Sequence, residues 1–179
     1  MNEDLRTLRR KEDNLGISGL AVLLFSMWDI VRFTMTLIMN PHALTDLLER
    51  MGVGKDELFI GGFVIVTIYA IILLGAFLIR LFIYLGARAE SRGKKRGWLY
   101  VIVAALVLAF IVADQTNAVI DTFNGAAAAR AEELGEMDTA TASGLLNITS
   151  AFALIDIILS SATIKSIRKK YNIKDGEVK

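Results

Sequence analysis

Residues 58–79 form a stretch of 22 amino acids without a single charge. An α-helix rises about 1.5 Å per residue, so this stretch is long enough to cross a hydrocarbon core of roughly 30 Å. Three further apolar blocks precede or follow it, each with a few polar interruptions. The sequence therefore predicts an all-α integral membrane protein, a bundle of four transmembrane helices over residues 15–39, 58–86, 98–121 and 145–167.

Composition supports a membrane protein over a soluble one. The chain has 179 residues, of which 54% are hydrophobic, and its mean hydropathy is +0.51. A soluble domain is about 45–50% apolar, and here the excess is concentrated in the four blocks. The chain has no cysteine, one histidine and one proline. Disulfides and cysteine metal sites are therefore excluded, and little material remains for histidine chemistry.

The first block, residues 15–39, is the weakest of the four because it contains Asp29 and Arg32. Each of these charges costs about 2.5–3.5 kcal/mol near the centre of a membrane helix, which offsets most of the apolar gain. The alternative is a secretory signal peptide, since basic residues precede an apolar run. Acidic residues crowd that basic segment and no small-residue cleavage site follows the run directly. We therefore expect an uncleaved first span.

Lysine and arginine residues predict the topology. If the chain crosses the membrane four times, 15 of its 20 basic residues lie on one side, and the two opposite connections hold only Arg50, Lys55 and Arg130. By the positive-inside rule, residues 1–14 and 168–179 are then short cytoplasmic tails. Three spans would place the N-terminal basic cluster outside, so the charges also support the first span. The expected location is the bacterial cytoplasmic (inner) membrane.

The first outer connection has its own helical pattern. Leucine or methionine recurs at positions 44, 47, 48 and 51, after Asn40-Pro41 and before Gly52. This spacing is typical of an amphipathic helix with a proline at its first position and a glycine stop. We expect a short amphipathic helix on the outer membrane surface. An alanine-rich segment, residues 126–134, favours helix in the second outer connection.

Charged residues inside the predicted spans are the main functional candidates, because charge in hydrocarbon is usually paired, hydrated or functional. Helix rise places Asp29, Arg32, Asp114 and Asp156 about 20–25 Å from the inner boundary. We expect Arg32 to face Asp114 and Asp156, with Asp29 one turn from Arg32. Polar flanking residues extend this cluster: Gln115, Asn117 and Asn147. Arg80 is placed outside it, at the inner end of its helix, where its side chain can reach the headgroups.

Two hypotheses explain this cluster of one cation and three carboxylates. The first is packing, in which the charges hold helices together within the chain, in a homo-oligomer or against a partner membrane subunit. The second is ion handling, in which the carboxylates bind a monovalent cation or relay protons. A dry arginine–carboxylate pair favours a scaffold or assembly protein, and carboxylates lining a wet cavity favour a small channel or transporter.

Two further residue sets point to contacts. Ala105, Ala109 and Ala113 recur every four residues and allow close approach of a neighbouring helix, within the bundle or in a second chain. Cytoplasmic basic clusters can attract anionic lipids of the bilayer, although most such clusters only determine topology. They comprise Arg92, Lys94, Lys95, Arg96, Lys165, Arg168, Lys169 and Lys170.

Catalytic and nucleic-acid motifs are missing from the sequence. There is no HExxH, GxSxG, P-loop or strand-associated GxGxxG pattern, and the basic clusters lack the interleaved aromatics of nucleic-acid binding. We therefore expect a protein that is not an enzyme, with no cofactor, metal or nucleic-acid partner.

Overall fold

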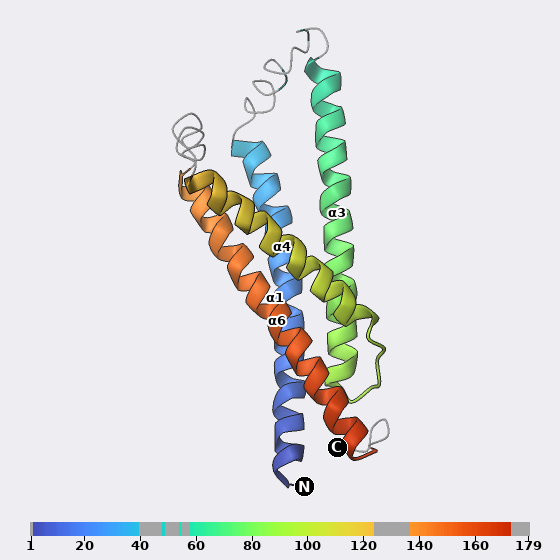
Figure 1. Cartoon of the computed structure of the whole chain (residues 1–179). Coiled ribbons are helices and arrows are strands. Elements are labelled where there is room, and N and C mark those ends of the chain that lie inside the picture. The colour runs from blue at the N-terminus through green and yellow to red at the C-terminus, as the bar shows by residue number, and fades with distance from the viewer. Residues whose placement is uncertain (1, 40–47, 49–53, 55–57, 124–136, 173–179) are drawn as a thin grey trace. The chain divides into compact units, whose positions relative to one another are not determined.

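The computed structural model describes residues 2–39, 48, 54, 58–123 and 137–172. These residues contain four long α-helices and no strand: α1 (Asn2–Met39), α3 (Leu58–Ser91), α4 (Leu99–Phe123) and α6 (Met137–Lys170) (Figure 1). All four are long and apolar enough to cross a membrane. The prediction of an all-helical chain with four helices long and apolar enough to span a membrane is confirmed for the described residues. The expected outer helices fall on residues 41–52 and 126–134, which lie outside the described residues except for Leu48.

Large apolar side chains cover much of the helix surface. Phe59, Phe63 and Phe110 are 86%, 69% and 75% exposed. An apolar surface of this kind suits contact with lipid, because hydrocarbon solvates it without the cost that water imposes.

The chain divides into two compact units, and each is described by itself. The first, here the large unit, comprises residues 1–22 and 82–179, and the second, the small unit, comprises residues 23–81. Helices α1 and α3 each contribute a segment to both units, whereas α4 and α6 belong to the large unit alone.

In the large unit, the inward face of α1 follows a seven-residue pattern. Buried residues occur at Leu8, Glu12, Leu15, Gly19 and Val22, separated alternately by four and three positions. This is the spacing of helices that pack side by side with interlocking side chains. The pattern begins well before residue 15, so residues 2–14, predicted as a tail, are part of the packed helix.

Helix α6 has the same periodicity and packs against α4 (Figure 1). Leu154, Ile157, Ser161, Ile164 and Arg168 are all buried, at alternating steps of three and four. The apolar members of this set join the core of the large unit. The polar members place a hydroxyl and a guanidinium on the same inward face.

Glycine allows two close approaches in the large unit. A Cβ atom added to Gly19 would lie 3.0 Å from Ala87 Cβ, and one added to Gly86 would lie 2.5 Å from Tyr100 Cγ. Small residues at such contacts let helix backbones come together. The second contact fixes the Tyr100 ring against α3.

A tight glycine cap ends α3. Gly93 has a φ of 84°, its N–H donates to the Glu90 carbonyl at 3.1 Å, and the Lys94 N–H donates to the Ala89 carbonyl at 3.1 Å. These two bonds constitute a Schellman motif, in which glycine adopts the left-handed conformation. The cap fixes the start of the connection to α4, which begins with a turn closed on the Trp98 carbonyl.

Among the described residues of the small unit, α1 and α3 contact each other through an ion pair and an aromatic pair. Arg80 Nη1 lies 2.5 Å from Asp29 Oδ2. The rings of Phe33 and Tyr69 are stacked, with centroids 4.9 Å apart. These contacts define the register of the two helix segments in this unit.

Candidate functional site

A buried ion pair between α3 and α6 forms the centre of the large unit's polar interior. The Glu90 side chain is 1% exposed, and Lys165 Nζ donates to its two carboxylate oxygens at 2.8 and 2.6 Å. Glu90 lies in the last turn of α3, so the cap at Gly93 holds its backbone in place.

Two hydroxyl groups complete the coordination of this pair. Ser161 Oγ donates to Glu90 Oε2 at 3.0 Å and accepts from Lys165 Nζ at 2.7 Å. The Tyr100 hydroxyl also binds Glu90 Oε2 and lies 2.8 Å from Ser161 Oγ. A buried charge is tolerated when its hydrogen-bonding capacity is satisfied, as it is here. Aromatic rings add to this: Lys165 Nζ lies 5.1 Å from the ring centroids of both Trp98 and Tyr100, within cation–π range.

Arg168 connects three parts of the large unit. Its Nη2 atom donates to Glu12 Oε1 at 2.7 Å and to the Glu90 carbonyl at 3.0 Å, and its Nη1 atom donates to the Lys94 carbonyl at 3.3 Å. The last two acceptors belong to the last turn of α3 and to the connection that follows it. Arg168 therefore ties α1 and the end of α3 to α6.

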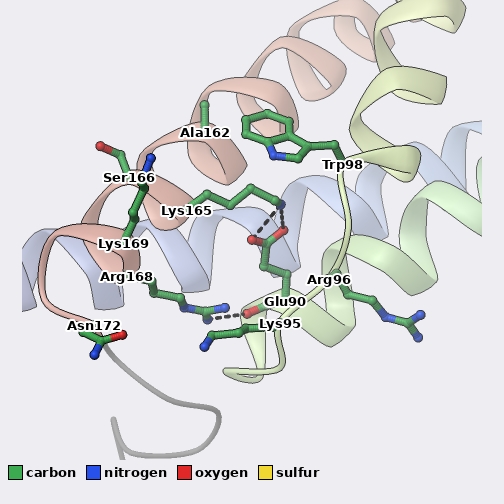
Figure 2. Close-up of a pocket in the computed structure, with 10 residues that line it drawn as sticks. All are labelled: Glu90, Lys95, Arg96, Trp98, Ala162, Lys165, Ser166, Arg168, Lys169 and Asn172. Carbon is green, nitrogen blue, oxygen red and sulfur yellow. Dashed lines mark hydrogen bonds and ion pairs between the residues drawn. The ribbon is translucent and has the colours of Figure 1, made fainter.

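A basic cavity of about 670 Å³ opens beside these groups (Figure 2). Figure 2 shows Lys165 reaching Glu90 with the Trp98 ring alongside, while Arg96 points away from the ion pair. Five cations and one carboxylate line this cavity: Lys95, Arg96, Lys165, Arg168, Lys169 and Glu90. We refer to it below as the basic cavity.

The predicted membrane cluster is distributed over both units. Asp29 and Arg32 belong to the small unit, and Asp114 and Asp156 to the large unit. The expected approach of Arg32 to Asp114 and Asp156 links the two units, so it stays a prediction. The exclusion of Arg80 was wrong, because Arg80 is the residue that pairs with Asp29.

The two aspartates of the large unit have different surroundings. Asp156 is half-buried and accepts hydrogen bonds from Ser18 Oγ at 2.6 Å and Ser160 Oγ at 3.1 Å. Asp114 is exposed and has no hydrogen-bond or ion-pair partner among the described residues. Of the flanking polar residues, Asn117 is exposed and Asn147 half-buried. Gln115 lines an apolar groove of about 390 Å³ on α4 and α6.

The alanines predicted for helix packing and the basic residues predicted for lipid contact differ in how exposed they are. Ala105, Ala109 and Ala113 are exposed on α4, so the choice between packing inside the bundle and contact with a second chain stays a prediction. Lys165 and Arg168 turn inward to Glu90 and Glu12. The remaining basic residues are exposed, namely Arg92, Lys94, Lys95, Arg96, Lys169 and Lys170. Lys170 also pairs with Asp4 at 2.7 Å.

Sequence reasoning missed Glu12, Glu90, Tyr100 and Ser161 as members of the site. A signal existed in the seven-residue spacing that carries Glu12 in α1 and Ser161 in α6, because both occupy positions where apolar residues are expected. No comparable signal identifies Glu90 or Tyr100, whose roles depend on how α3 and α4 pack.

No known protein family, curated protein or solved structure matches this chain.

Proposed function

We propose that this chain is a non-enzymatic scaffold or assembly protein of the membrane, in which intramembrane and interfacial charges determine how the helices pack. One observation carries this proposal: three carboxylates each join a different pair of helices. Asp29 of α1 binds Arg80 of α3, Asp156 of α6 binds Ser18 of α1, and Glu90 of α3 binds Lys165 of α6.

Helix pairing of this kind favours a structural use of the charges. Hydrogen bonds between membrane helices contribute about 0.6 kcal/mol on average, so hydrogen-bonded links such as Asp156–Ser18 are modest in energy. Their value lies in specificity, since a helix rotated or shifted by one residue would leave a carboxylate without its partner. In the large unit, the links Asp156–Ser18 and Glu90–Lys165 each disfavour a rotated or shifted α6.

The burial of Ser161 argues against catalysis by the polar interior of the large unit. Ser161 Oγ and Lys165 Nζ lie 2.7 Å apart, which is within the reach required between a nucleophile and its base. Ser161 is fully buried, however, so its hydroxyl is not presented to a substrate. Both side chains donate hydrogen bonds to the Glu90 carboxylate instead.

Ion handling is the alternative that an experiment must separate from this proposal. Carboxylates that carry ions line a hydrated path. Neither the basic cavity nor the groove on α4 and α6 is lined by Asp29, Asp114 or Asp156.

The test compares Asp156→Asn with Asp114→Asn in proteoliposomes and in detergent. Both variants remove one carboxylate from a membrane helix, but only Asp156 has partners among the described residues. We expect no proton or monovalent-cation flux from the wild type, a less stable Asp156→Asn protein and an Asp114→Asn protein of unchanged or higher stability. Flux in the wild type that disappears in a folded Asp156→Asn or Asp114→Asn variant would overturn the scaffold proposal.

We further propose a bacterial cytoplasmic membrane with both termini in the cytoplasm. The basic residues near both termini and in the α3–α4 connection support this orientation. Because the chain has no cysteine, single cysteines introduced at Thr7 and Asn172 can be labelled without background. Both should be protected from a membrane-impermeant maleimide in intact cells, and labelling of either one would contradict the proposed topology.

A further inference from the structure

The basic cavity has more positive charge than its acidic neighbours neutralise. Two of its five cations are compensated within the chain, Lys165 by Glu90 and Arg168 by Glu12. The other three, Lys95, Arg96 and Lys169, are exposed and have no acidic partner among the described residues. The cavity therefore has three uncompensated cations on its lining.

These cations are held by fixed backbone. Lys95 and Arg96 directly follow the glycine cap of α3, and Lys169 lies in the last turn of α6 next to the anchored Arg168. Figure 2 shows Lys95 and Arg96 on the connection after α3 and Lys169 on α6, with Arg96 directed away from the Glu90–Lys165 pair. An anion entering the cavity thus meets cations from two different elements.

The volume of the basic cavity and the side chains that line it indicate which class of ligand it can bind. A volume of about 670 Å³ is within the usual range for small-molecule sites, roughly 300–1,000 Å³. Arginine and lysine side chains in combination are the usual donors to phosphate oxygens. Trp98, which is 52% exposed, lines the same cavity, and the exposed apolar face of α4 begins at the adjacent Leu99. Charge and apolar surface therefore meet at this point, as they do in a phospholipid.

We propose that the basic cavity binds a phosphate group, supplied by an anionic phospholipid headgroup or by a soluble phosphate compound. The chain contains two tryptophans, and one of them lines the cavity. A Trp28→Phe background leaves Trp98 as the single fluorescent reporter. The protein is reconstituted in phosphatidylcholine vesicles with equal small fractions of brominated phosphatidylglycerol or brominated phosphatidylcholine, which quench tryptophan on contact.

In the background protein we expect brominated phosphatidylglycerol to quench Trp98 more strongly than brominated phosphatidylcholine. The preference is the ratio of quenching by brominated phosphatidylglycerol to quenching by brominated phosphatidylcholine. It should fall roughly fivefold for each cation removed. The test variant removes all three cations: Lys95→Gln/Arg96→Gln/Lys169→Gln. The matched control carries the same charge change on exposed residues of α1 that do not line the cavity: Arg6→Gln, Arg9→Gln and Arg10→Gln. That control should keep the preference. Lys169→Gln alone provides a milder variant, expected to lower the preference if the triple variant does not fold.

A second arm distinguishes the two sources of phosphate. Inorganic phosphate and glycerol 3-phosphate are titrated into vesicles that contain only phosphatidylcholine. A saturable change in Trp98 emission without a phosphatidylglycerol preference assigns the site to a soluble compound, and a preference without that change assigns it to the lipid. Equal quenching by both lipids together with no response to either phosphate compound would overturn the proposal, as would an equal loss of preference in the α1 control.

Discussion

Neutralising Glu90 should destabilise the protein because it leaves a buried cation without its counter-charge. In Glu90→Gln the amide oxygen can still accept from Tyr100 and Ser161, so shape and most hydrogen bonds are kept. What is lost is the negative charge that meets Lys165 Nζ at 2.6 and 2.8 Å. Breaking a buried pair by removing one partner costs about 3–5 kcal/mol. Lys165 keeps 16% of its side chain exposed at the cavity, so we expect the lower end, about 3 kcal/mol.

A double-mutant cycle separates this charge interaction from the other effects of substitution. Lys165→Met alone leaves the Glu90 carboxylate buried without its cation, and we expect at least as large a loss. The double variant Glu90→Gln/Lys165→Met removes both charges and should recover much of the stability. The expected coupling free energy is at least about 2 kcal/mol. The measurement is the free energy of unfolding in mixed micelles, from a denaturing-detergent titration followed by circular dichroism.

The reasoning about the ion pair fails under either of two results. One is a loss below about 1 kcal/mol for Glu90→Gln, which would mean that Lys165 relaxes into water at little cost. The other is a double variant whose loss equals the sum of the two single losses, which would mean that the charges do not interact.

Three glycine substitutions give further predictions, each measured by the same unfolding titration. Gly86→Ala should destabilise by about 1–3 kcal/mol, because its new Cβ would lie 2.5–2.9 Å from Tyr100 side-chain atoms. Gly75→Ala, at a helix position with no atom within 4 Å, is the matched control and should be neutral or stabilising by up to about 1 kcal/mol; equal effects would contradict the close contact. Gly93→Ala should cost about 1–2 kcal/mol because its φ of 84° places a side chain in the left-handed region, and an unchanged stability would refute the proposed cap.

Hydropathy predicted the number and approximate place of the helices, because long apolar runs are a direct requirement of the bilayer. It underestimated their length. The first span was expected from residue 15, but α1 begins at Asn2, and the last was expected over residues 145–167, but α6 covers Met137–Lys170. Charged residues dilute the hydropathy of residues 2–14, although Leu8 and Glu12 continue the inward pattern of Leu15. For residues 2–14, the spacing of inward-facing residues is therefore a better indicator of helix than hydropathy.

The partners of the charges were harder to predict, because helix rise gives depth but not direction around the axis. Arg80 was placed by its height alone, and its pairing with Asp29 depends on which face of α3 meets α1. Glu90 lies beyond the predicted end of its span at residue 86, so no argument about intramembrane charge included it. Tyr100 lies at the start of α4, and the partner of its hydroxyl, Glu90, depends on how α3 and α4 pack.

The bond between Arg168 and Glu12 has a consequence for the order in which the protein is made. These residues are separated by 156 positions, so Glu12 is synthesised well before the guanidinium that neutralises it. Until α6 has been made, the inward face of α1 carries a carboxylate without this partner. The contact between α1 and α6 in the large unit therefore forms only after α6 has been synthesised.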